Sequence, residues 1–269
     1  MNKNTLSKNI VIVLTFIFLY APIIVLVIYS FNKSKMNVIW TGFTLDWYKR
    51  LFENTDLLEA FRNTLLIAGI STITSTIIGT ISALGLYKYN FPLKKLVNRL
   101  IYIPIVIPEI VLGISLLSVF TMANLKLGLV SIIISHIAFS IPFVITSVRS
   151  TLNLLPKEYE EAAIDLGANK FNVFTKVTLP LIMPGVVSGG LLALTLSMDD
   201  VVISYFTAGP GSNTLPLQIY SIIKTGITPD VNALSTLILL VTIIVLTLAA
   251  IIQSKKIARR GYWWKKIFS

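Results

Sequence analysis

Residues 155–184 read LPKEYEEAAIDLGANKFNVFTKVTLPLIMP and form a charged segment between strongly apolar runs. Pro156 suits the first turn of a helix, because its fixed φ fits helix geometry and its missing N–H breaks no helical bond. The glutamates of the EYEE run that follows favour the positive end of the helix dipole. Gly167 supplies the permissive backbone that often ends a helix. The stretch therefore predicts a short helix, a turn, and a second short helix that leads back into an apolar span.

The spacing within this stretch resembles the EAA loop of ABC importer permeases. That family has Glu-Ala-Ala, three residues, Gly, nine residues, Ile, one residue and Leu-Pro; here Val177 stands in place of the Ile. The resemblance implies a type I ABC importer permease fold, in which this loop is a coupling helix seated in a cleft of a cytoplasmic ATPase subunit. The coupling role then falls on Glu161, Ala162, Ala163, Gly167, Leu179 and Pro180. The alternative is a solvated helix start, since acidic first turns are common.

The composition is that of an integral membrane protein. The chain has 269 residues, of which 55% are hydrophobic and 13% charged, and its mean hydropathy is +0.81. Cysteine is absent, which excludes a disulfide framework and a thiolate metal site. The net charge of +11 comes from basic residues that flank apolar runs, so it indicates membrane topology and not nucleic-acid binding.

Apolar runs in the sequence predict an all-α protein with six transmembrane helices. Each run is long enough to cross a hydrocarbon core of about 30 Å at about 1.5 Å per residue. The first run exceeds the apolar part of a signal peptide, so we expect a retained span. The predicted spans are 10–31, 64–87, 100–122, 127–148, 181–206 and 231–252.

The distribution of basic residues predicts the orientation of these spans. Lys and Arg concentrate in the loops at 88–99 and 149–176 and in the tail at 255–266, which all lie on one side of the predicted membrane. The positive-inside rule makes this side cytoplasmic, together with both termini. The YWWKK end of the tail suits contact with anionic lipid. We expect three parts, at 1–62, 63–252 with the coupling loop at 155–180, and 253–269.

Trp47 lies in the polar segment that follows the first span. The run LDWYKRLFENTDLLEAF suits an amphipathic helix along the membrane surface. Tryptophan at this level usually anchors a protein at the interface. Alternatively, its ring stacks on a cationic substrate near the outer mouth of a pathway.

Three carboxylates lie inside predicted spans. Asp199 and Asp200 fall roughly 27 to 29 Å along the fifth span, and Ser197 shares a helical face with Asp200. Glu109 directly follows Pro108, where we expect a kink in the third span. Charged groups within spans are costly and mark ion or substrate pathways.

These spans contain no Lys or Arg, so a cation from outside the chain is the natural partner for their carboxylates. A polyvalent amine suits separated carboxylates better than a metal ion, which needs a tighter oxygen cage. The aspartates alternatively stabilise a helix interface, and Glu109 alternatively bonds a partner subunit. His136 is the one histidine of the chain; it is either functional or a satisfied packing residue.

The run from Leu196 to Leu234, and the chain as a whole, resembles the C-type permeases of spermidine/putrescine importers. The resemblance implies a second, different permease, a pair of ATPase subunits and an extracytoplasmic polyamine-binding protein as partners. Residues 215–224 would then dock the binding protein or gate the path. Alternatively, they form an amphipathic helix packed on the bundle.

The sequence predicts a transport subunit and not an enzyme. It contains no phosphate-binding loop of the G-x-x-x-x-G-K-[ST] type, so ATP would be bound by a partner and no cofactor by this chain. Neither catalytic residues nor a metal-ligand cluster is visible. Two alternatives remain: an importer permease for another cationic solute or metal ion, and a secondary transporter, which would show inverted repeats.

Overall fold

In the residues that it describes, the computed structural model contains helices joined by loops, and its β structure is one isolated bridge between Asn32 and Phe43. Contacts divide the chain into two units, Met1–Thr55 with Ile222–Ser269, and Asp56–Ser221. The basic tail at 253–269 lies outside the described residues, so its predicted lipid contacts stay a prediction. The residues described are 3–34, 39–156, 158–225, 230–244 and 247.

The first unit contains α1 (Lys3–Tyr29), α2 (Asp46–Glu53) and an apolar helix at Asp230–Ile244. From Lys8 onward α1 is long and apolar enough to cross a membrane, which confirms the predicted first span. The helix at Asp230–Ile244 belongs to the predicted sixth span. The end of that span lies beyond the described part of the chain.

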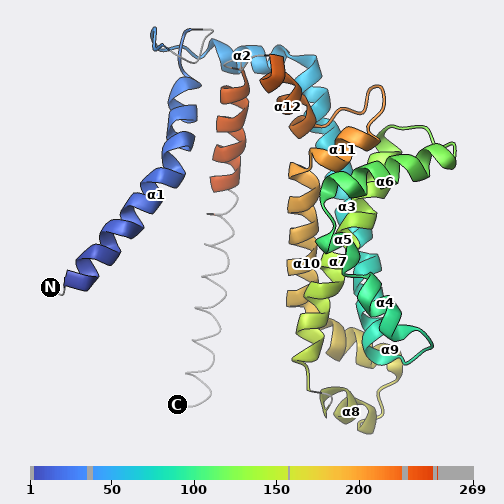
Figure 1. Cartoon of the computed structure of the whole chain (residues 1–269). Helices are drawn as coiled ribbons and strands as arrows, with labels where there is room; N and C mark the ends of the chain where they lie inside the picture. The colour runs from blue at the N-terminus through green and yellow to red at the C-terminus, as the bar shows by residue number, and fades with distance from the viewer. Residues whose placement is uncertain (1–2, 35–38, 157, 226–229, 245–246, 248–269) are drawn as a thin grey trace. The chain divides into compact units, whose positions relative to one another are not determined.

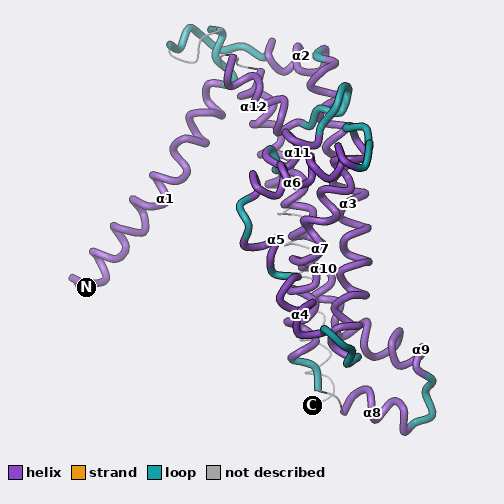
Figure 2. Tube along the Cα trace, turned by 45° about the vertical axis from the view of Figure 1, so that its right-hand side comes forward, coloured by secondary structure: helices purple, strands orange, loops and turns teal. Residues whose placement is uncertain are grey.

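The second unit is built on long helices that lie side by side (Figures 1 and 2). These are α3 (Thr55–Lys88), α7 (Leu129–Asn153) and α10 (Leu179–Asp199), and each belongs to a stretch apolar enough to span a membrane. Their core is made of small and branched side chains, which allow the helices to approach closely. Its buried members include Ala83, Val144, Val148, Leu152, Ile182 and Ala193.

The predicted second short helix of the charged stretch leads directly into the long helix α10. After α9 (Lys170–Val173) comes a π-helix, η1 (Phe174–Thr178), which continues into α10 without a loop. The continuous helical segment Lys170–Asp199 is thus longer than the span expected to begin at residue 181.

The third predicted span is broken where a kink was expected. Its parts are α4 (Lys94–Leu100), α5 (Ile103–Val106) and α6 (Glu109–Met122), and the axis turns by 110° before Glu109. Pro108 has an extended backbone with ψ 133° and lacks the N–H that a continuing helix needs. The kink is confirmed, but the expectation of one helix across 100–122 is wrong.

The fifth predicted span is also interrupted. α10 ends at Asp199, Asp200 has an extended backbone with ψ 125°, and α11 (Val202–Thr207) begins after the break. The Asp200 carboxylate accepts hydrogen bonds from the backbone N–H groups of Ile203 and Ser204. A side chain that bonds nearby backbone in this way competes with helix continuation, so the prediction of one helix over 181–206 is wrong.

Close packing of α7 against α10 depends on glycine. A Cβ added to Gly185 would lie 2.9 Å from Thr151 Cβ and 3.1 Å from the Ser147 carbonyl oxygen. We therefore expect Gly185→Ala to destabilise the folded protein by about 1–3 kcal/mol, the usual cost of overpacking. The midpoint of thermal unfolding in detergent measures this change. Gly69→Ala is the matched control, since open space surrounds that position; equal destabilisation by both variants would contradict the expectation.

Candidate functional site

The charged stretch forms a helix and turn at one end of the second unit, as the sequence predicted (Figure 1). α8 (Glu158–Asp165) begins two residues after Pro156. Gly167 follows the helix with φ +83°, a left-handed conformation that glycine adopts without steric cost. Its N–H donates to the Ile164 carbonyl, and the N–H of Ala168 donates to that of Ala163, so the turn closes the end of α8.

The surface of α8 and its turn is open and partly apolar. Every described residue of α8 is exposed or half-buried, and Leu166 has 89% of its surface exposed. Glu161, Ala162 and Gly167 lie on this surface, and Ala163 is half-buried. Exposed apolar side chains are available here for contact with another molecule. The large apolar side chains exposed here are Tyr159, Ile164, Leu166 and Phe171.

The other two predicted coupling residues have a different position. Leu179 packs against the core of the second unit, and Pro180 lies in the first turn of α10. Both therefore help to begin the span, while the residues of α8 and its turn form the exposed surface.

Glu160 fixes α8 to the membrane helices. Its two carboxylate oxygens each accept a hydrogen bond of 2.9 Å from Lys88 Nζ at the end of α3, and Oε1 accepts one of 2.5 Å from Thr178 Oγ1 in η1. Partial burial raises the pKa of Glu160, but the bonds from Lys88 and Thr178 outweigh it and hold that pKa below its ordinary value of 4.5. We call these three residues the α8 clamp. Sequence spacing gives no signal for it, because its members meet only in three dimensions.

We expect the α8 clamp to depend on opposite charges. Lys88→Glu or Glu160→Lys alone places like charges together, so backbone hydrogen exchange of α8 at neutral pH should accelerate; combining both changes should slow it again. The pKa of Glu160 is lowered in the folded state, so ionised Glu160 stabilises the fold at pH values above its ordinary pKa of 4.5. This stabilisation is lost as the pH falls through the pKa of the folded state. Exchange corrected for intrinsic rates should therefore accelerate in acid in the unmodified protein and change less in Glu160→Gln.

At the opposite end of the second unit, the two breaks in the spans bring carboxylates together. Glu109 begins α6, Asp199 ends α10 and Asp200 occupies the gap before α11, while α6 packs against α11. Glu109 lies close enough to both aspartates for their charges to interact. Glu109 and Asp199 are exposed, whereas Asp200 is buried. The sequence predicted these residues, but not that chain breaks unite them.

Asp200 and Ser197 bond inside the protein. His136 Nε2 lies 3.2 Å from Asp200 Oδ2, and its Nδ1 lies 2.7 Å from Ser197 Oγ. His136 is 2% exposed and has a partner on each ring nitrogen. The hydrogen-bonding groups of His136 are thus satisfied inside the protein, as the packing interpretation expected. His136 also supplies Asp200 with a nearby ring nitrogen, although the predicted spans contain no Lys or Arg.

Trp47 is a buried residue of the first unit. Its ring is 6% exposed, its Nε1 donates a 2.6 Å hydrogen bond to the Asn32 carbonyl, and the Arg50 guanidinium lies 5.2 Å from the ring centre. The cation over the ring is thus Arg50, and the tryptophan holds the segment after α1 in place. Within the first unit, Trp47 thus makes contacts inside the protein, and the geometry favours neither an interfacial anchor nor stacking on a substrate.

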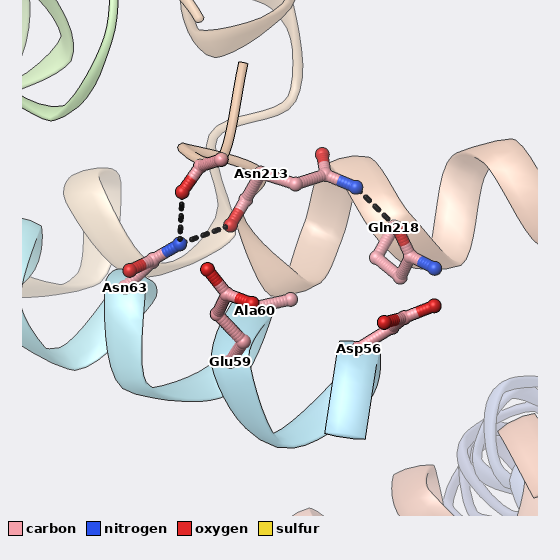
Figure 3. Close-up of a pocket in the computed structure, with 7 residues that line it drawn as sticks. Asp56, Glu59, Ala60, Asn63, Asn213 and Gln218 are labelled. Carbon is pink, nitrogen blue, oxygen red and sulfur yellow. Dashed lines mark hydrogen bonds between the residues drawn. The ribbon is translucent and has the colours of Figure 1, made fainter. Parts of the chain in front are cut away.

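A polar pocket of about 220 Å³ lies at the same end of the second unit as the carboxylates (Figure 3). Asn63 Nδ2 donates to the carbonyls of Gly211 and Asn213 across it. α12 (Leu215–Thr225) begins beside it, with the Leu215 N–H bonded to Thr64 Oγ1. This contact favours the interpretation of 215–224 as a helix packed on the bundle. The pocket, which the sequence analysis missed, is lined by Asp56, Glu59, Ala60, Asn63, Gly211, Asn213 and Gln218.

Residues 75–260 match the family model described as the binding-protein-dependent transport system inner membrane component, and the chain belongs to this family. It is 44% identical to the spermidine/putrescine transport system permease protein PotC of Escherichia coli K12 over 242 residues, 90% of each chain. It is 41% identical to PotC of Haemophilus influenzae, covering 94% of this chain and 97% of the relative. It is 39% identical to the putrescine transport system permease protein PotI of Escherichia coli K12, covering 86% of this chain and 85% of the relative.

Solved structures confirm the predicted fold. A subunit of a bacterial ABC transporter that imports alginate superimposes with a TM-score of 0.71, covering 93% of this chain and 98% of that chain at 16% identity. A chain of the MetNI methionine ABC transporter superimposes with a TM-score of 0.59, covering 72% of this chain and 92% of that chain at 22% identity. The chain therefore has the all-α, type I ABC importer permease fold, and it is a membrane-embedded permease.

Proposed function

We propose that this chain is a permease subunit of an ATP-driven importer of polyamines such as spermidine or putrescine. The observation that carries the substrate class is the group formed by Glu109, Asp199 and Asp200 at two broken spans. Similarity to PotC and PotI along most of the chain supports the same class. Separated carboxylates suit a substrate that carries separated ammonium groups.

In this proposal the exposed carboxylates meet the substrate. Glu109 and Asp199 provide counter-charge for passing ammonium groups, and buried Asp200 and Ser197 support the break beside them. Affinity stays modest, because a site that holds its cation too tightly does not release it. Trp47 contributes as an anchor of the first loop.

Energy reaches the pathway from another subunit. A cytoplasmic ATPase dimer binds and hydrolyses ATP, and the exposed surface of α8 and its turn seats in a cleft of one ATPase subunit. A second permease completes the pathway, and an extracytoplasmic binding protein delivers the substrate. In this proposal the α8 end and both termini are in the cytoplasm of a prokaryotic cell, and the chain itself carries no cofactor. ATP-driven closure moves α8 and rocks the two permeases between outward and inward access.

Substrate affinity tests the role of the exposed carboxylates. We expect Asp199→Asn and Glu109→Gln each to raise the KM for spermidine or putrescine roughly tenfold, as for loss of one charge-assisted hydrogen bond. The measurement is uptake of radiolabelled amine by cells that lack their own importers and express this chain with its partner permease, ATPase and binding protein. Glu53→Gln, which changes an exposed residue at the end of α2, is the control. No uptake of either amine by the verified intact complex would point to a different solute.

Coupling depends on the small side chains of α8. We expect Ala162→Phe to abolish uptake, because the added ring prevents close approach of a cleft wall to the exposed helix face. Binding of the ATPase subunit during purification should weaken in parallel. Glu158→Gln, at the start of the same helix, should retain both. Normal uptake by Ala162→Phe would place the ATPase contact elsewhere.

A further inference from the structure

A continuous chain of hydrogen bonds crosses the second unit beside the α10–α11 break. Ser71 Oγ of α3 lies 3.0 Å from Ser197 Oγ of α10, which lies 2.7 Å from His136 Nδ1 of α7. The other ring nitrogen, Nε2, lies 3.2 Å from both Asp200 Oδ2 and Ser204 Oγ of α11. All five residues are buried. The imidazole therefore connects the two sides of the break to two neighbouring helices.

The chemistry of Asp200 determines the direction of the bond to His136. Its carboxylate already accepts the backbone N–H groups of Ile203 at 3.1 Å and Ser204 at 2.7 Å. An ionised carboxylate only accepts hydrogen bonds, so Nε2 of His136 is the donor. The Nδ1 side of the ring then faces Ser197, whose hydroxyl either donates or accepts. Ser71, at the end of the chain of hydrogen bonds, also donates to the Ala68 carbonyl at 3.4 Å.

We propose that His136 is a positioning residue of the cation pathway. By bonding Asp200 it fixes the break between α10 and α11, and thereby keeps Asp199, the last residue of α10, in place. This inference rests on the proposed function for its substrate. Its structural content, that the imidazole fixes the position of Asp199, is independent of which solute is carried.

The energetics of a buried polar chain support this role. Removal of the imidazole leaves the Asp200 carboxylate and two serine hydroxyls with fewer partners in a membrane interior, where unsatisfied polar groups are costly. The protein lowers the cost of these unsatisfied polar groups by moving Asp200 toward water or by rearranging the break between α10 and α11. Either movement displaces the adjacent Asp199. Loss of His136 should therefore change substrate affinity, although the imidazole itself is buried and does not meet the substrate.

Uptake kinetics separate positioning from general stability. His136→Leu should raise the KM for the transported amine roughly tenfold, with less effect on the maximal rate per assembled complex. His136→Gln, whose amide nitrogen reaches the position of Nε2, should restore much of the affinity. In an Asp199→Asn background, His136→Leu should add little to KM, because the carboxylate that it places is gone. A purely structural residue would instead lower the amount of complex equally in both backgrounds.

Thiol labelling tests the same inference without a substrate, since the chain has no native cysteine. Asp199→Cys and Thr195→Cys, one turn earlier on α10, both replace exposed residues. We expect His136→Leu to change the rate of labelling by a cationic methanethiosulfonate several-fold at 199 and not at 195. Equal rates at 199 with and without His136 would overturn the positioning role. Changed labelling in a complex that takes up neither amine would support it while rejecting the proposed substrate.

Discussion

A membrane interior requires every backbone N–H and C=O group to find a partner within the protein, and most of this structure follows from that requirement. Unbroken helices satisfy it by themselves, as in α3 and α7. A break in a span exposes polar backbone and needs a local remedy. At the end of α10 the remedy is the Asp200 side chain, which bonds the first free N–H groups of α11.

That remedy introduces a buried carboxylate, which needs a partner of its own. His136 supplies the partner and is held in turn by serines of neighbouring helices. The interruption of α10 and the histidine of α7 are thus two parts of one solution. Buried Asp200 and His136 thus fix the position of the exposed Asp199.

The two ends of the second unit carry different charged groups. At one end, Glu160 ties a short exposed helix to α3 and η1. At the other, carboxylates gather where α10 and the third span are interrupted. The segment Lys170–Asp199 joins the two ends as one continuous helical path. Glu160 bonds α8 to Thr178 within this segment, so a displacement of α8 would reach the carboxylate end along a helix.

The sequence predicted those features that depend on local patterns. Hydropathy located the spans, the EYEE run and Gly167 located α8 and its turn, and Pro108 located a bend. It failed where side chains distant in sequence decide the outcome. The residues on either side of Asp199 and Asp200 are apolar enough to continue one helix, and this pattern outweighed the preference of aspartate for helix N-termini in the prediction. The meeting of Lys88 with Glu160, and the pocket around Asn63, likewise arise from folding alone.

The π-turn of η1 has a consequence for how this chain tolerates change. A π-turn holds one residue more than an α-turn, and one residue of α-helix corresponds to about 100° of rotation. The extra residue therefore sets the phase between residues before the π-turn, such as buried Val173, and residues after it, such as Leu179, which packs against the core. Deleting a single residue from 174–178 would turn the exposed surface of α8 and its turn by more than a quarter of a circle relative to the core of the second unit. The segment thus sets the angular alignment of two surfaces, and its length is as constrained as its sequence.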